Sequence, residues 1–213
     1  GFLLSEGLVH SPADIEEIRV LGGESKTNEI LVELAASVDV EEWRLQRSTL
    51  LTSACGLCGK STIESIHTRT NQANAVGSPI SAALVRQLPS LLEQWQPGFG
   101  RSGGLHAAAS IRSDGTVTSA FEDIGRHNAL DKVIGHLFRT QQSSGDGELF
   151  FLSSRGSFEL VQKALAANGT VLATVGAPSS LAIELARAGN LTLIGFVRDG
   201  YFNIYSGELR VDS

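Results

Sequence analysis

Apolar residues recur at helical spacing in three segments of the second half of the chain: 126–138, 158–167 and 181–188. This spacing predicts amphipathic helices. Uncharged runs rich in valine, isoleucine and leucine alternate with these helices, at 149–152, 171–175 and 191–197. Strands of this kind, separated by single helices, favour parallel pairing in a sheet that is covered on both faces.

Further short strands flank this alternating region. Segments 105–111 and 116–121 surround Asp114-Gly115, which is typical of a hairpin turn. A last strand is expected at 202–205, so the predicted element order is β-β-α-β-α-β-α-β. This pattern indicates an α/β lobe.

The first hundred residues give weaker signals. Strands are expected at 18–21 and 30–34. Residues Ser11-Pro12-Ala13-Asp14 predict the start of a helix, with a serine cap followed by proline. Another helix is expected over 79–95, kinked or divided by Pro89.

The segment Gln96-Pro97-Gly98-Phe99-Gly100 is predicted to interrupt the regular secondary structure and to separate two lobes. We therefore expect two lobes. One is an N-terminal α+β lobe of residues 1–98, which contains a cysteine loop at about 52–76, and the other is an α/β lobe of residues 99–213.

The composition excludes several protein classes. The chain has 213 residues, 42% of them hydrophobic, and a net charge of −6, which argues against a general nucleic-acid coat. The longest uncharged run, 164–183, is broken by Asn168-Gly169, Gly176 and Pro178, so it predicts strand, turn and helix and no bilayer span. No signal peptide is evident. We expect a cytoplasmic protein without membrane insertion, and the lack of any methionine suggests a start inside a longer gene product.

The two cysteines lie three residues apart in a glycine-flanked loop, at Cys55 and Cys58. Nearby Lys60 would favour a thiolate. A zinc or iron–sulfur site normally needs four ligands, and only His67, His106 and His127 could add to the pair. A redox pair, a persulfide carrier and two ordinary buried cysteines are the other interpretations.

Polar residues gather where predicted strands end. Glu122, Asp123, Arg126 and His127 span a strand end and a helix start, where parallel sheets bind ligands. The alternative is that the two carboxylates only cap a helix.

Three further turns complete this set. Gly103 and Gly104 precede His106 and allow close backbone approach, although a single histidine on an apolar strand is more often a core residue. Ser154 and Arg155 suit an anion, with a Ser157 helix cap as the structural alternative. The last turn could hold a base and a phosphate; its residues are Phe196, Val197, Arg198, Asp199, Gly200 and Tyr201. Together these turns predict a nucleotide-like ligand over the sheet, with the thiol loop delivered to it.

Several segments resemble motifs of the formate dehydrogenase accessory sulfurtransferase family (FdhD): 54–60, 103–108, 122–132, 159–164, 177–182 and 193–196. These segments stand in the same order as the motifs of the family, and together they extend over nearly the whole chain. The resemblance implies a cytidine-deaminase-like, three-layer α/β/α C-terminal lobe beside a smaller, N-terminally truncated α+β lobe.

The resemblance also implies a sulfur relay. Members accept sulfur from a cysteine desulfurase, hold it as a persulfide and pass it to molybdenum bis(molybdopterin guanine dinucleotide), which goes to formate dehydrogenase. Cys55 matches the persulfide cysteine and Cys58 its partner. The segment Phe196 to Tyr201 matches the part that binds the guanine dinucleotide, so a guanine nucleotide should mimic the substrate. The family suggests a homodimer.

Two alternatives stay open. The protein could be a cofactor-binding chaperone without sulfur chemistry, or a zinc-dependent deaminase-like enzyme. Zinc deaminases need His-x-Glu and Pro-Cys-x-x-Cys, whereas Ala107-Ala108 follow His106 here. We therefore expect no metal ligands.

Overall fold

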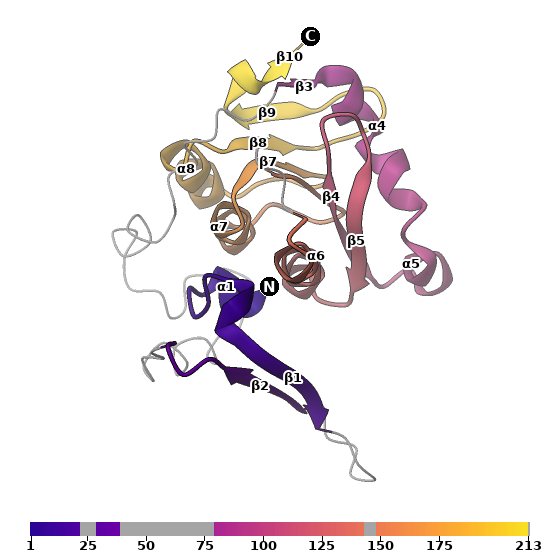
Figure 1. Ribbon diagram of the computed structural model, residues 1–213. Helices are drawn as coiled ribbons and strands as arrows, with labels where there is room; N and C mark the ends of the chain where they lie inside the picture. The colour runs from indigo at the N-terminus through magenta and orange to yellow at the C-terminus, as the bar shows by residue number, and fades with distance from the viewer. Residues whose placement is uncertain (22–28, 39–78, 143–147, 213) are drawn as a thin grey trace.

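A six-stranded sheet with helices on both faces forms the larger part of the molecule (Figure 1). The computed structural model describes residues 1–21, 29–38, 79–142 and 148–212. The expected α/β class is confirmed.

The sheet has the strand order β5-β4-β6-β7-β8-β9. Its strands are β4 (His106–Ile111), β5 (Val117–Asp123), β6 (Glu148–Leu152), β7 (Gly169–Thr174), β8 (Thr192–Gly195) and β9 (Asn203–Ser206). β6, β7 and β8 are parallel, as predicted, while β4 is antiparallel to β5 and β6, and β9 is antiparallel to β8. The carboxyl ends of the three parallel strands therefore meet on one side, which we call the carboxyl end of the sheet.

Helices cover the two faces of the sheet with separate apolar cores. α6 (Arg126–Thr140), α7 (Phe158–Ala166) and α8 (Ser180–Ala188) bury their apolar sides on one face, where Leu130 and Leu160 are fully buried. α4 (Ala82–Glu93) covers the other face. Its Leu88 and Leu92 pack in one cluster with Phe151 of β6. The result is three layers, α/β/α.

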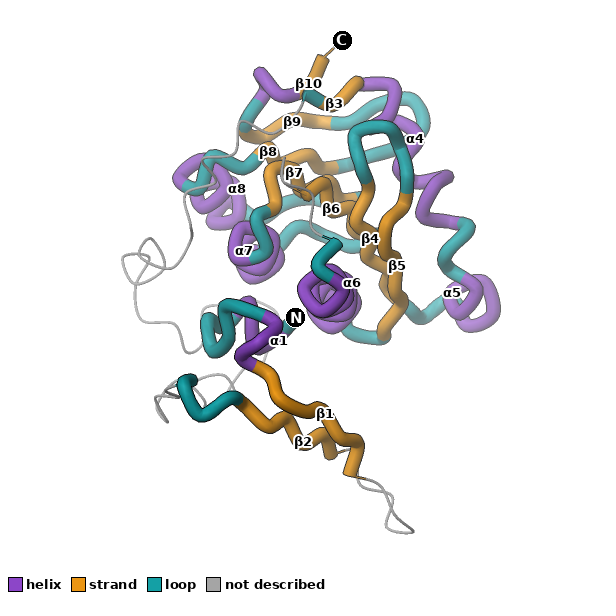
Figure 2. The backbone as a smooth tube through the Cα atoms, viewed as in Figure 1, coloured by secondary structure: helices purple, strands orange, loops and turns teal. Residues whose placement is uncertain are grey.

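The N-terminal part extends away from these layers (Figures 1 and 2). It consists of α1 (Phe2–Ser5), a 3-10 turn (Pro12–Asp14), and the antiparallel strands β1 (Ile15–Leu21) and β2 (Glu29–Leu34). α1 contacts α6, where the Ser5 hydroxyl donates to Asp131 at 3.4 Å.

Short elements complete the described fold. β3 (Ile80–Ser81) pairs in parallel with β10 (Val211–Asp212), which follows a 3-10 turn at Glu208–Arg210. α5 (Pro97–Ser102) follows α4. Among the described residues, no helix has the length and apolar character needed to cross a bilayer.

Two local predictions were wrong. The helix start at Ser11 is a complete capping box, but it opens only one 3-10 turn. Residues Ile15–Leu21 then pair with β2, and this pairing prevents the turn from continuing as a helix. The break predicted around Gly98 is instead α5. Its first backbone N–H groups, at Gly98 and Phe99, donate to the Glu122 carboxylate at 2.7 and 2.6 Å.

The helix predicted over 79–95 is a single helix that includes Pro89. It packs on the large sheet, so the described residues just before position 98 belong to the same packed layers as residues 99–212. A division of the chain after residue 98 would separate α4 from the sheet that it covers.

Candidate functional site

The loops after β6, β7 and β8 lie side by side and are joined through their backbones. Gly176 donates its N–H to the Ser154 carbonyl at 2.9 Å, and its own carbonyl accepts from Phe196 at 3.2 Å. Gly156 donates to the Ala177 carbonyl at 3.1 Å. This backbone ladder brings two of the predicted turns, around Ser154 and Phe196, to the carboxyl end of the sheet.

His106 lies beside the first of these loops. It begins β4, and the next residue, Ala107, donates its N–H to the Ser153 hydroxyl at 2.8 Å. His106 also pairs in register with Asp123 at the end of β5, three residues before Arg126. The structure thus brings His106, Arg126 and the Ser154–Arg155 loop together, as predicted.

Two guanidinium groups, those of Arg126 and Arg155, form a cation cluster here beside the imidazole of His106. Burial lowers the pKa of His106, and the positive charges of Arg126 and Arg155 lower it further. The Arg126 Nε atom is buried and has no hydrogen-bond partner among the described residues. Because no ion pair within the described part of the chain involves either arginine, the cluster suits an anion.

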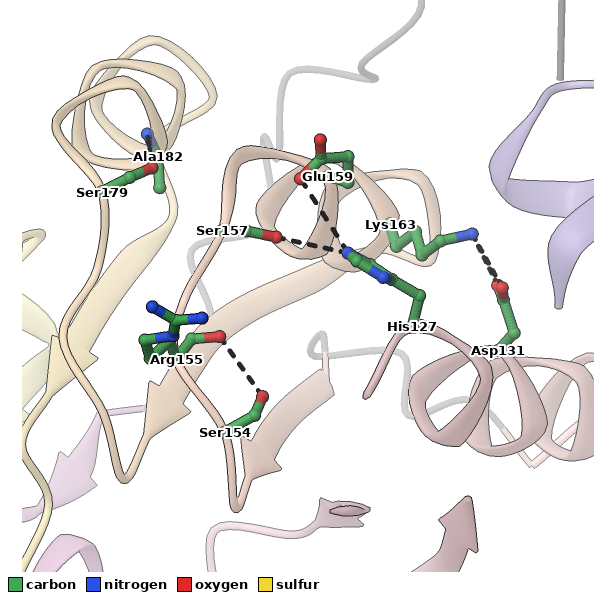
Figure 3. A network of polar contacts seen from close by, with 9 residues as sticks. All are labelled: His127, Asp131, Ser154, Arg155, Ser157, Glu159, Lys163, Ser179 and Ala182. Atoms are coloured by element: carbon green, nitrogen blue, oxygen red, sulfur yellow. Dashed lines mark hydrogen bonds and ion pairs between the residues drawn. The ribbon is translucent and has the colours of Figure 1, made fainter. Parts of the chain in front are cut away.

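His127 points to the start of α7 (Figure 3). Its Nε2 atom lies 3.4 Å from the Ser157 hydroxyl and 3.9 Å from the Glu159 carboxylate. Ser157 occupies the N-cap position of α7, but its side chain makes no capping hydrogen bond. The capping role considered for Ser157 is therefore wrong, and its hydroxyl contacts His127 instead.

The pKa of His127 is lowered from 6.5, mainly by burial and then by the Arg126 charge, although Glu159 opposes the shift. The folded protein therefore favours the neutral ring. The stability that comes from neutral His127 is fully present above the unfolded-state pKa of about 6.5. It is lost as the pH falls through the lower pKa of the folded state. We expect the free energy of unfolding to fall between about pH 7 and pH 5, with a shallower slope in His127→Gln.

Urea denaturation at a series of pH values measures this slope. Gln87→Ala, which changes an exposed residue that does not titrate, is the control and should keep the wild-type slope. His106 has a shift of the same sign, so part of the slope should remain in the His127 variant. Identical slopes for His127→Gln and wild type would contradict the assignment.

The carboxylates of Glu122 and Asp123 have structural partners. Glu122 caps α5, as described above, and Asp123 accepts from the Gly125 backbone at 2.9 Å and pairs with Lys132 at 2.6 Å. These hydrogen bonds, that of Lys132 first, lower the pKa of Asp123. Helix capping, the alternative weighed for both residues, describes the contacts of Glu122, whereas Asp123 accepts from the residue just before α6 and pairs with Lys132 without capping the first turn.

A buried ion pair close to His127 was not anticipated. Lys163 of α7 donates to both oxygens of Asp131 of α6, at 2.9 and 2.8 Å, and its side chain is 9% exposed. The Lys163 ammonium also lies 5.5 Å from the centre of the Phe2 ring. Asp131 and Lys163 lie in two of the segments that resemble family motifs, 122–132 and 159–164, but nothing in the sequence indicates that these two side chains form an ion pair.

The segment from Phe196 to Tyr201 divides into two parts. Phe196 adopts a left-handed conformation with φ of 54°, which is costly for a residue other than glycine, and Val197 is buried. Arg198 donates to the backbone carbonyls of Val175 and Val197 at 2.7 and 2.8 Å, so it joins the ends of β7 and β8. Four residues of the segment are exposed, and three of them follow Arg198 and could meet a ligand: Asp199, Gly200 and Tyr201.

Other predicted site residues have local explanations. Gly103 ends α5 with φ of 64°, a conformation that favours glycine, and no atom would contact a Cβ there. Gly104 is exposed. The Ser154 hydroxyl is buried and donates to the Arg155 carbonyl at 3.2 Å. Ligand contacts by these residues stay predictions.

Cys55 and Cys58 lie outside the described residues. Within the described ranges, no three histidine, cysteine, aspartate or glutamate side chains are grouped as a metal site would require.

Comparison with known proteins identifies the relatives of this chain. The model of the FdhD/NarQ family matches residues 1–212. Sulfur carrier protein FdhD of Streptomyces coelicolor is 39% identical over 218 residues, covering 99% of this chain and 77% of the relative. The protein of the same name from Nocardia farcinica is 41% identical, covering 100% and 77%.

The fold has a solved counterpart. A crystal structure from Desulfotalea psychrophila, described as that of a formate dehydrogenase accessory protein, superposes with a TM-score of 0.77. It covers 99% of this chain and 77% of the other, at 21% identity, and so supports the fold alone. Together with the match over 212 residues, the curated relatives show that this chain belongs to the FdhD/NarQ family.

Proposed function

We propose that this protein is a sulfur carrier that serves formate dehydrogenase. The observation that carries the proposal is the Cys55-x-x-Cys58 pair in a chain that aligns over 99% or more of its own length with proteins named sulfur carriers. In this proposal a cysteine desulfurase supplies the sulfur, and Cys55 holds it as a persulfide. The acceptor is molybdenum bis(molybdopterin guanine dinucleotide), which then passes to formate dehydrogenase.

The first step is a thiol exchange. The Cys55 thiolate attacks the terminal sulfur of the donor persulfide, a new S–S bond forms, and the donor cysteine leaves as a thiolate. Lys60, five residues away, favours the attacking thiolate by its charge. Cys58 assists release of the sulfur. We place this relay in the cytoplasm, where thiols stay reduced.

The carboxyl end of the sheet fits the substrate. A guanylated pterin is large, flat and anionic, and it needs cationic groups together with an exposed aromatic ring. The cation cluster supplies the charge, and exposed Tyr201 supplies a ring. We extend the proposal to a homodimer and to a cytidine-deaminase-like ancestry for the α/β/α layers, in which the zinc chemistry is absent.

Mass spectrometry of the intact protein tests the relay. After incubation with a desulfurase and cysteine, we expect the wild type to gain the mass of one sulfur atom, about 32 Da, which is lost on reduction. Cys55→Ala should gain none, and Ser53→Ala, in the same loop, should behave as wild type. A persulfide that persists in Cys55→Ala would overturn the assignment of Cys55.

A cofactor-binding chaperone is the second candidate, because the cation cluster would bind the substrate with or without sulfur chemistry. It predicts nucleotide binding together with normal sulfuration of the cofactor when both cysteines are replaced. The proposed relay predicts that this sulfuration is lost.

A further inference from the structure

The short helix α5 is held in place by a residue far along the chain, at the end of β5 (Figure 1). The N-cap residue of α5, Gln96, makes no side-chain capping hydrogen bond. The Glu122 carboxylate accepts from the backbone N–H groups of Gly98 and Phe99 instead, one with each oxygen. Hydrogen bonds to an ionised carboxylate are stronger than those between neutral groups. Glu122 therefore fixes the start of α5 to the large sheet.

The far end of α5 is hydrogen-bonded to the turn that leads into β4. Gly103 donates its N–H to the Phe99 carbonyl at 2.7 Å. The Ser102 hydroxyl donates to the Gly98 carbonyl at 2.8 Å and accepts from the Gly104 N–H at 3.2 Å. The two residues that bind the carboxylate through their N–H groups thus hold the Gly103-Gly104 turn through their carbonyl groups.

This turn lies at the carboxyl end of the sheet. β4 begins at His106 and is antiparallel to β6, so the residues just before His106 lie beside the loop after β6. A Cβ on Gly103 would meet no described atom within 4 Å, and one on Gly104 would meet only the Ser102 carbonyl, at 3.9 Å. The turn therefore presents open backbone to a ligand that binds at this end of the sheet.

Gly98 allows α5 and the Glu122 carboxylate to approach closely. A Cβ on Gly98 would lie 2.7 Å from Glu122 Oε2 and 2.6 Å from Leu105 Cδ1, closer than real Cβ atoms come. Both atoms end flexible side chains, so Gly98→Ala would move the carboxylate away from the N–H groups that it accepts from, without displacing the backbone. A Cβ on Gly100, in the same helix, would meet no described atom within 4 Å. The two glycines form a matched pair for testing the cap.

We propose that Glu122 is a positioning residue for substrate binding, because its cap on α5 holds the Gly103-Gly104 turn at the carboxyl end of the sheet. This inference rests on the proposed function, which supplies the substrate. The carboxylate is already bonded to two backbone N–H groups, so it acts through the turn. A turn that is held in advance loses less conformational entropy on binding than one that a ligand must order.

Isothermal titration of the full chain with GDP, as a mimic of the substrate, tests this role. Glu122→Gln replaces one acceptor oxygen by an amide group that cannot accept, so we expect GDP to bind about three- to tenfold more weakly. Gly98→Ala should also weaken GDP binding, without a change of charge. Glu93→Gln, at the exposed last residue of α4, and Gly100→Ala are the matched controls, and both should bind as wild type.

Amide hydrogen exchange measured by NMR separates positioning from general stability. The Gly103 and Gly104 amides should exchange faster in Glu122→Gln and Gly98→Ala, while the amides of α6 and β6 keep their wild-type protection. A purely structural role for Glu122 would instead speed exchange throughout the sheet and leave the GDP affinity of the folded protein unchanged.

The outcomes distinguish this inference from the proposed function. Wild-type GDP affinity in both Glu122→Gln and Gly98→Ala would refute the positioning role alone. A wild type that binds no GDP would refute this role together with the guanylated substrate. A wild type that forms no persulfide would refute the sulfur relay, whatever the nucleotide titrations show.

Discussion

Replacing Cys55 and Cys58 together by alanine is expected to abolish formate oxidation in cells that lack their own copy of this gene. These 213 residues contain two cysteines, so the double variant removes every thiol of this sequence. An alanine side chain cannot form a persulfide. The activity of formate dehydrogenase in cell extracts, measured by formate-dependent dye reduction, should fall to the level of cells without the gene.

The single variants separate the two thiols. Cys55→Ala should match the double variant, while Cys58→Ala should keep part of the activity if Cys58 only assists release. Ser53→Ala is the control for changes in the same loop, and immunoblots confirm equal amounts of protein. Full activity in the double variant would refute the relay and favour the chaperone.

Replacing Lys163 by methionine should destabilise the protein severely. The substitution leaves the Asp131 carboxylate, whose side chain is 14% exposed, without its main partner. Breaking a buried ion pair on one side typically costs about 3–5 kcal/mol. Urea denaturation followed by circular dichroism measures the loss as a lower free energy of unfolding.

Two comparisons make this test specific. Lys132→Met removes a pair with Asp123 in which the lysine side chain is 46% exposed, and it should cost less than about 1 kcal/mol. The double variant Lys163→Met, Asp131→Leu should recover most of the lost stability, because neither charge remains. Equal losses in Lys163→Met and Lys132→Met would show that the buried pair contributes no more than the exposed one.

The spacing of apolar residues predicts an element well when the residues of that element form the apolar side that packs on the core. Helices expected at 126–138, 158–167 and 181–188 appear within a few residues of those bounds, because each buries one apolar side on the sheet. α5 was missed since its cap comes from Glu122, far along the chain. A cap of that kind leaves no local trace in the residues of the helix.

The position of the candidate site could be predicted from the sequence, but the contacts of its side chains could not. Turns after parallel strands are expected to converge, and those at Ser154 and Phe196 do. The role of each side chain could not be predicted, because it depends on neighbours from other segments. Arg198, expected to face a ligand, donates to the Val175 carbonyl, and Ser157, for which a helix cap was the structural alternative, contacts His127.

The backbone ladder from Ser154 through Gly176 to Phe196 has an evolutionary consequence. Main-chain groups join these loops, so most side chains along them can be exchanged without altering the frame that presents them. Descendants of a common ancestor could therefore exchange exposed residues such as Asp199 and Tyr201 while the loops keep their arrangement. Gly176 would resist such drift, since any larger residue there pushes Arg155 aside.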